Sequence, residues 1–229
     1  MRALLKLSGT AFGKAGLERE SLEYVAAELA AALSLSSSGD VELAVVVGGG
    51  NLVRGRDLPR MDRAIADQMG MLATVINGLA LQEALSQRGI PAALQSAVAV
   101  PWAEPVDPRR AREALSQKRV VIFAGGTGNP FVTTDTAAAI RAAEINAEVL
   151  LKATDVDGVY TADPKRDPSA QKIPSLTYER AIHERLGVMD LAALALCEQY
   201  GIPIVVFDFF REGNLQRVLE GEEIGTRVS

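Results

Sequence analysis

The amino-acid sequence predicts an α/β protein with three layers, in which helices cover both faces of a central, mostly parallel β-sheet. Short, nearly continuous apolar segments alternate with longer amphipathic segments along the whole chain. This is the pattern of strands buried on both faces and of helices that pack on them. No internal repeat and no domain linker divides the 229 residues. We therefore expect a single domain over residues 1–229, with right-handed crossovers between parallel strands.

The order of the elements follows from these segments. Six apolar segments are predicted strands, at residues 3–7, 41–47, 92–97, 120–124, 149–151 and 204–207. Six amphipathic segments are predicted helices, at residues 20–33, 62–88, 107–117, 135–144, 189–200 and 214–220. Asp107 followed by Pro108 is typical of a helix start, a capping side chain and then proline at the first helical position. Residues 160–175, with three prolines, are expected to form a longer connection that is mobile or covers a ligand.

The composition limits the partners and the compartment. The 24 Lys and Arg residues and the 29 Asp and Glu residues give a net charge of -5, which argues against partners such as duplex DNA that are held by bulk positive charge. One cysteine, Cys197, cannot form an internal disulfide and is expected in the core. The first nine residues lack a signal-peptide core, and no apolar run approaches the roughly 20 residues of a membrane span. We expect a cytoplasmic protein without membrane or nucleic-acid partners.

Small residues follow four of the predicted strands. Ser8 and Gly9, residues 48–51, residues 125–129, and Ala153 with Thr154 all come at strand ends, and ligands of such sheets bind beyond the carboxyl ends of the strands. Glycine lets backbone N–H groups approach and bind phosphate oxygens. The alternative for any one loop is a tight turn without a ligand, but four such loops at one edge favour a phosphate site.

Two common phosphate motifs are absent. Residues 9–15 resemble a P-loop, yet one residue too few separates the glycines, and Ala15 stands where Ser or Thr should hold magnesium. Residues 126–128 begin like a dinucleotide fingerprint, but Phe131 stands in place of the third glycine. The sequence therefore supports neither a P-loop kinase nor a Rossmann dehydrogenase.

Two lysines lie at the ends of apolar strands, although the chain has only six lysines against 18 arginines. Lys6 and Lys152 would be costly to bury unless an anion occupied the space between them, and a compact ammonium can follow a moving phosphoryl group. Arg54 adds a third cation at the same edge. The alternatives are lysines whose stems are buried while their ammonium groups lie in water, and a solvated loop arginine.

Phosphoryl transfer mainly needs alignment of donor and acceptor and neutralisation of charge on the phosphoryl oxygens. Asp135 begins a predicted helix behind Thr133 and Thr134. We expect it to cap that helix and to orient the lysines or the metal-bound phosphates; the alternative is a simple helix cap.

Five motifs together resemble the bacterial uridylate (UMP) kinases of the amino acid kinase family, over residues 2 to about 228. The motifs are residues 6–9, 47–55, 67–78, 126–135 and 152–160. The first and fifth are shared across the amino acid kinases, whereas segments 69–74 and 127–131 are specific to the uridylate branch. The resemblance implies transfer of the ATP γ-phosphate to UMP, giving UDP for pyrimidine nucleotide supply, with magnesium carried by ATP. It also implies a homohexamer assembled through the long helix at residues 62–88.

The resemblance also implies residue roles. Those expected to contact ATP are Lys6, Leu7, Ser8, Gly9, Gly50, Arg54, Thr154, Tyr160 and Asp163. Those expected to contact UMP are Gly49, Asp67, Thr127, Gly128, Asn129, Pro130, Phe131, Val132, Thr133 and Thr134. Lys6, Arg54 and Lys152 would be the transition-state cations and Asp135 their organiser, with no metal held directly by the protein. The acceptor part would span roughly residues 1–145 and the ATP part residues 146–229.

Some positions depart from the family pattern. Thr10 replaces a glutamate, and Asp155 places an acid where a lysine is common, near the expected nucleotide pocket. Family members are typically activated by GTP and inhibited by UTP, but Gln82, Ser86 and Ala93 replace the basic effector contacts of proteobacterial members. The sequence leaves the response to these effectors open.

Two other functions are compatible with the same fold. One is a different amino acid kinase, acting on a carboxylate or a carbamate; segment 127–131 argues against it. The other is a catalytically silent protein that binds a nucleotide or an oxyanion. Retention of Lys6, Lys152 and Arg54 argues against the second, because a silent binder would not need all three cations.

Overall fold

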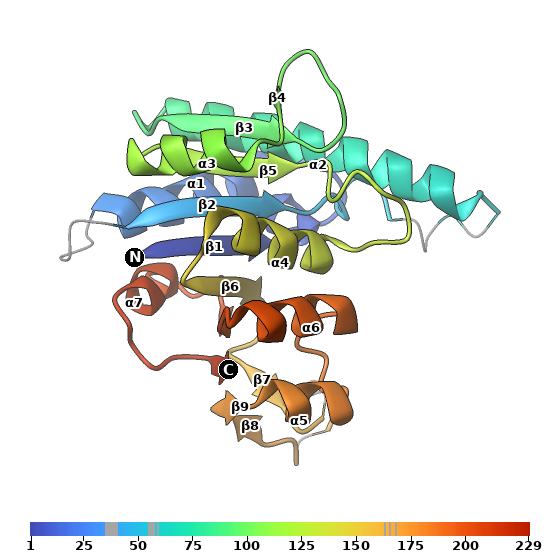
Figure 1. Ribbon diagram of the computed structural model, residues 1–229, viewed down its shortest axis with the longest axis vertical. Helices are drawn as coiled ribbons and strands as arrows, with labels where there is room; N and C mark the ends of the chain where they lie inside the picture. Colours follow the sequence, from blue (N-terminus) through green and yellow to red (C-terminus); the bar gives the residue numbers. More distant parts are fainter. Residues whose placement is uncertain (35–40, 55–57, 59, 163, 165, 168) are drawn as a thin grey trace.

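A nine-stranded sheet forms the centre of the computed structural model (Figure 1), which describes residues 1–229 except 35–40, 55–57, 59, 163, 165 and 168. The strand order is β4-β3-β5-β2-β1-β6-β10-β11-β9, and β10 with β11 is its antiparallel pair. These strands are β1 (Arg2–Leu7), β2 (Glu42–Val47), β3 (Ala92–Ser96), β4 (Glu104–Pro105), β5 (Val120–Ala124), β6 (Val149–Thr154), β9 (Ser175–Leu176), β10 (Ile204–Asp208) and β11 (Thr226–Val228). The prediction of a mostly parallel sheet is confirmed.

Helices cover both faces of this sheet. They are the 3₁₀ helix η1 (Gly9–Phe12) and the α-helices α1 (Arg19–Ser34), α2 (Arg63–Ser86), α3 (Pro108–Ser116), α4 (Thr134–Ile145), α5 (Tyr178–His183), α6 (Leu191–Tyr200) and α7 (Asn214–Leu219). One core lies between the sheet and α1, α2 and α7, and includes Leu5 and Leu7 of β1. The other lies between the sheet and α3 to α6, and includes Leu4 of β1 and Cys197. The three-layer prediction and the core position of Cys197 are confirmed.

Several short elements differ from the sequence prediction. Residues 160–175 were expected to be a long connection, but strands β7 (Val159–Tyr160) and β8 (Lys172–Ile173) form an antiparallel hairpin there. The sequence prediction also lacked β4, β9, β11 and α5. Strands of two or three residues and a six-residue helix are too short to produce a recognisable hydrophobic period. Asp107 does cap α3 with Pro108 in its first turn, as predicted.

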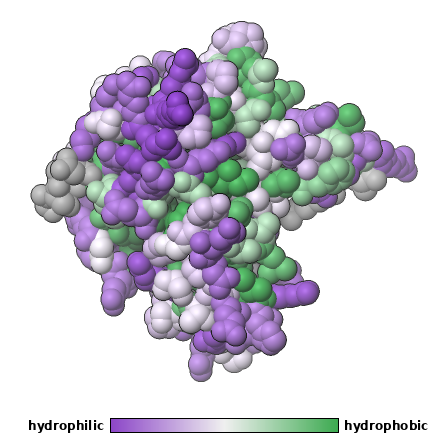
Figure 2. Space-filling model, in the orientation of Figure 1, coloured by the Kyte–Doolittle hydropathy of each residue, from purple (hydrophilic) through white to green (hydrophobic). Residues whose placement is uncertain are grey.

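Among the helices of the described residues, one is long and apolar enough to cross a membrane, and it is α2. The expectation that no apolar segment approaches such a length therefore does not hold for α2. However, 44% of the most apolar 18-residue stretch of α2 is buried inside the protein, and the core helices of folded domains have the same apolar composition. The outer face of α2 leaves Ile65, Leu72 and Ile76 about half exposed, and Figure 2 shows hydrophobic residues among polar ones along the projecting end of this helix.

Candidate active site

The two strand-end lysines point to the same face of the sheet. β1 and β6 are parallel neighbours, and Lys6 lies directly beside Lys152 in their register. Side chains alternate between the faces of a strand, so Lys6 and Lys152 share the face of Leu4 and Leu150, which pack in the core beneath α3 to α6. Both ammonium groups are therefore directed toward the helices of that layer.

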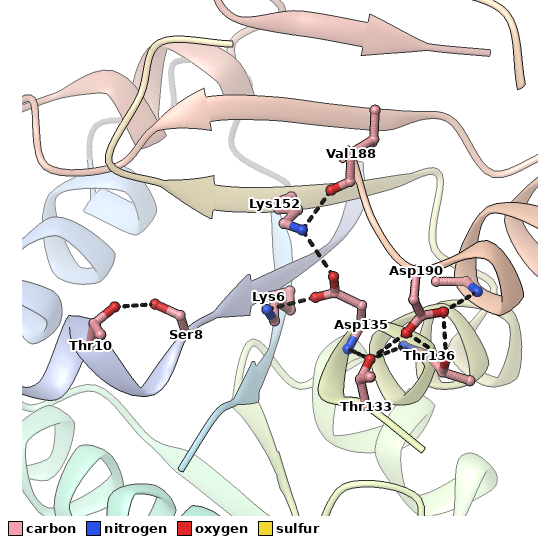
Figure 3. Close-up of polar contacts among 10 residues, drawn as sticks. Lys6, Ser8, Thr10, Thr133, Asp135, Thr136, Lys152, Val188 and Asp190 are labelled. Atoms are coloured by element: carbon pink, nitrogen blue, oxygen red, sulfur yellow. Dashed lines mark hydrogen bonds and ion pairs between the residues drawn. The ribbon is translucent and has the colours of Figure 1, made fainter. Parts of the chain in front are cut away.

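Asp135, in the first turn of α4, meets both lysines (Figure 3). Its carboxylate lies 2.6 Å from Lys6 Nζ through Oδ1 and 2.9 Å from Lys152 Nζ through Oδ2. The three side chains are between 10% and 15% exposed. We call these residues the lysine–aspartate cluster. The predicted anion between the lysines was a bound phosphate, and in the structure the carboxylate of Asp135 lies between them. The predicted role of Asp135 in orienting the lysines agrees with this geometry.

The ionisation of the cluster follows from its burial and its charges. Burial alone would raise the pKa of the Asp135 carboxyl, but Lys6 and Lys152 together hold it below its ordinary value. For Lys152, burial lowers the pKa, Asp135 opposes that shift, and the neighbouring charge of Lys6 adds to it. Two ammonium groups and one carboxylate leave one net positive charge in the cluster, which suits an additional anion.

The expected capping role of Asp135 is wrong. The N-cap of α4 is Thr133, whose hydroxyl accepts hydrogen bonds from the backbone N–H groups of Asp135 and Thr136. Because Thr133 satisfies these donors, the carboxylate of Asp135 is free to turn toward β1 and β6. The cap thus places Asp135 without using its side chain.

The glycine loops after β1 and β2 lie against each other. A Cβ added at Gly9 would lie 2.3 Å from the backbone nitrogen of Gly50, and one added at Gly48 would lie 2.6 Å from the nitrogen of Gly9. Real Cβ atoms do not approach backbone so closely. These glycines therefore allow the two loops to meet beside Lys6, where both line the same cavity.

Replacing Gly9 by alanine is expected to force these two loops apart. We expect Gly9→Ala to lose about 1–3 kcal/mol of unfolding free energy, as overpacking does, together with most of the activity. Chemical denaturation and an activity assay would measure both. Gly70→Ala is the control for stability: apart from the two neighbouring residues and the backbone of α2 itself, no described atom lies within 4 Å of the added Cβ, so stability should stay equal or rise. Equal stability of the two variants would contradict this interpretation.

The first cavity, of about 520 Å³, opens beside Lys6. Its walls bring together residues from the loops after β1, β2 and β5 and from the first half of α2, as expected for ligands at the carboxyl ends of strands. The predicted ATP and UMP residues among its walls are Lys6, Ser8, Gly9, Gly49, Gly50, Arg54, Asp67, Thr127, Asn129, Val132, Thr133 and Thr134. Arg54 is held by a hydrogen bond from its Nε to the carbonyl of Gly50.

Among the described residues predicted to contact ATP or UMP, four line neither this cavity nor the second cavity described below. Leu7 is fully buried in the core, so only its backbone could reach a ligand. Gly128, Pro130 and Phe131 shape the loop instead. Phe131 has a left-handed φ of 67° and is 69% exposed. Its backbone N–H donates to Asp67 at 2.8 Å, so Asp67 ties this loop to α2.

A second cavity, of about 410 Å³, reaches the lysine–aspartate cluster at Lys152 and also has Thr154, Tyr160 and Val188 among its walls. Thr154 and Tyr160 are predicted ATP residues, whereas Asp163 lies outside the described residues. Because Lys6 lines the first cavity and Lys152 the second, the two cavities are adjacent at the cluster that Asp135 joins.

The sequence reasoning missed several supporting residues. Asn77 of α2 is fully buried, donates to the carbonyl of Gly48 at 2.7 Å and pairs with Asn51. Thr74, also buried, accepts the N–H of Gly125 at 2.6 Å. Each fixes one glycine loop against α2. Both are polar residues on the buried face of α2, and this feature of the sequence could have identified them. Asp190, described below, gave no such signal because it lies at a helix start, where aspartate is common.

These features define an α/β protein with a cationic, glycine-lined site for phosphorylated ligands. The sequence model of the amino acid kinase family matches residues 1–208. The chain therefore belongs to the amino acid kinase family.

Solved structures place it more narrowly. The UMP kinase of Bacillus anthracis is 36% identical, with a TM-score of 0.94 over 100% of this chain and 95% of that chain. The UMP kinase of Ureaplasma parvum is 35% identical, with a TM-score of 0.90 over 100% and 98%. The uridylate kinase of Archaeoglobus fulgidus is 30% identical, with a TM-score of 0.76 over 100% of both chains. Within its family, the chain groups with these UMP kinases.

Proposed function

We propose that this protein is an ATP-dependent UMP kinase, which transfers the γ-phosphate of ATP to UMP and releases UDP and ADP. The observation that carries the proposal is the lysine–aspartate cluster at the junction of two cavities. A phosphoryl group that passes between ligands in the two cavities would travel past both ammonium groups. The full-length similarity to UMP kinases supports UMP as the acceptor.

The charges of the site suit direct in-line transfer. Lys6 and Lys152 would stabilise negative charge on the transferred group, Arg54 would add a third cation, and backbone N–H groups of the glycine loops would bind the remaining oxygens. Asp135 holds the two lysines in place and, with both carboxylate oxygens next to ammonium groups, is not available as a general base. In this mechanism the phosphoryl group passes directly from ATP to UMP, without a phosphoenzyme and without a protein base.

Each of the two cavities would hold one substrate. UMP would occupy the first cavity, where Asp67 can accept a hydrogen bond from the ribose and Thr127 and Asn129 can contact the uracil edge. The nucleoside of ATP would lie in the second cavity near Thr154 and Tyr160. Its phosphates would extend toward Lys6 and the loop after β1.

Magnesium would be carried by the phosphates of ATP. The described residues contain no group of three or more His, Cys, Asp and Glu side chains that could hold a metal ion, and Asp135 is already paired with two lysines. A nucleotide-bound ion fits such a site better than a protein-bound one. Bound magnesium would neutralise charge on the β- and γ-phosphates.

An assay of ADP formation with magnesium tests the proposal. The acceptors to compare are UMP, CMP, dTMP, AMP, glutamate, aspartate and carbamate. UMP should stimulate ADP formation most strongly. Turnover with an amino acid or carbamate but not with UMP would assign the protein to a different amino acid kinase activity. A lack of stimulation by every acceptor would indicate a silent binding protein. GTP and UTP added to the same assay would show whether they are effectors.

We propose that the protein forms a homohexamer in the cytoplasm, and the outer face of α2 supports contact between two copies through this helix. Leu72 and Ile76 are about half exposed there, and an interface would bury them. We expect Leu72→Glu combined with Ile76→Glu to reduce the mass measured by light scattering. Leu191→Glu, at an equally exposed leucine of α6, is the control and should leave the mass unchanged. An unchanged mass in the double variant would contradict assembly through α2.

A further inference from the structure

Asp190 joins the first turns of two helices next to the lysine–aspartate cluster (Figure 3). Its carboxylate caps α6 by accepting the N–H of Ala193 at 2.8 Å. The same carboxylate accepts the hydroxyl of Thr136 at 2.8 and 2.9 Å, and the hydroxyl of Thr133. Thr133 and Thr136 both belong to the start of α4. One side chain therefore fixes α4 to α6.

The segment that contains Asp190 also holds Lys152. Lys152 Nζ donates to the carbonyl oxygen of Val188 at 2.5 Å, in addition to its pair with Asp135. Val188 and Asp190 are separated by one residue, so the segment contacts the cluster in two places. It reaches Lys152 directly, and it reaches Asp135 through the first turn of α4.

We propose that Asp190 is a positioning residue for phosphoryl transfer, which keeps Asp135 and Lys152 in their active geometry by fixing α4 to segment 188–190. This inference rests on the proposed function. Asp190 does not line either cavity, so its effect on the reaction must be indirect. Small displacements matter because phosphoryl transfer depends on alignment to within a fraction of an ångström.

Thr136 offers the sharpest test, because it is buried, lines neither cavity and gives Asp190 only its hydroxyl. Thr136→Val removes the hydroxyl but keeps the branched shape, whereas Thr136→Ser keeps the hydroxyl. We expect Thr136→Val to lower kcat about tenfold with KM for ATP and UMP changed less than about threefold, and Thr136→Ser to stay within about threefold of the parent kcat.

Tyr178→Phe separates positioning from general loss of stability. It removes another buried hydroxyl hydrogen bond, from Tyr178 to the carbonyl of Ile202, just beyond the C-terminal end of α6. We expect it to lower Tm about as much as Thr136→Val while leaving kcat unchanged. Equal kcat in Thr136→Val and the parent, or equal losses in Thr136→Val and Thr136→Ser, would overturn the proposal.

Asp190→Asn adds a readout that does not require turnover. Asparagine can still cap α6, but it has no charge. The charged groups that act on Lys152 are Asp135, Lys6 and Asp190, and loss of Asp190 should lower the pKa of Lys152 further. NMR titration of the free protein would measure this shift as a check on the closeness of Asp190 to Lys152, while the kcat values of Thr136→Val and Thr136→Ser decide the proposal. Failure of the parent protein to phosphorylate UMP would instead overturn the proposed function, because the titration is independent of the acceptor.

Discussion

Lys152→Ala is expected to lower kcat about 100-fold or more while the affinity for UMP stays nearly unchanged. The ammonium group lies at the junction of the two cavities, so it would interact most strongly with charge that develops during transfer. Loss of such an interaction lowers kcat and kcat/KM together. Steady-state kinetics and calorimetric titration of UMP would measure rate and affinity separately.

Lys14→Ala provides the matched control, because Lys14 is an exposed lysine. Its kcat should remain close to that of the unchanged protein. If Lys152→Ala weakened UMP binding as strongly as it lowered the rate, Lys152 would be a residue for ground-state binding or for folding. That result would contradict its role as a transition-state cation.

Asp135→Asn is expected to damage both activity and stability. The amide keeps the shape of the carboxylate but leaves two largely buried ammonium groups without a counter-charge. Breaking a buried ion pair in this way typically costs about 3–5 kcal/mol, and we expect a loss of unfolding free energy of this order together with a fall in kcat of about 100-fold or more. Denaturant unfolding and steady-state kinetics would measure the two effects.

The pH dependence of the unfolding free energy tests whether the charge of Asp135 causes this loss of stability. The pKa of Asp135 is lowered in the folded protein from its ordinary value of 3.8, so the ionised carboxylate stabilises the fold above that pH. This contribution is lost as the pH falls through the lower folded-state value. Asp135→Asn should therefore lose less stability on acidification than the unchanged protein.

Glu222→Gln, which removes an exposed partner of Arg217, is the control for the size of the loss and should change stability by less than about 1 kcal/mol. A similar small loss in Asp135→Asn would contradict the buried cluster.

Much of the fold could be predicted because its long elements have clear hydrophobic periods. The six long strands and six of the helices lie close to their predicted positions. The two-residue strands β7, β8 and β9 could not be predicted, because their pairing depends on contacts between segments that are distant in sequence. Asp135 was predicted to cap α4, but the cap is Thr133. Both residue types cap helices, and only the backbone geometry shows which of them lies at the cap position.

The candidate site was predictable to the extent that it follows strand ends. Lys6 and Lys152 stood out because lysine is rare in this chain and costly within an apolar strand. The role of Asp190 could not be predicted in the same way. Its three partners lie on α4 and α6, and nothing in the local sequence indicates that the starts of these helices meet.

The sequence by itself determined the α/β class, the glycine-lined edge and the two lysines, because hydrophobic period and strand ends are local properties. Only the tertiary structure decided which anion lies between those lysines. The register of β1 and β6 brings Lys6 beside Lys152, and the Thr133 cap leaves Asp135 free to pair with both. The physical reason is that a charge pair depends on distances of a few ångströms between elements, which sequence spacing does not specify.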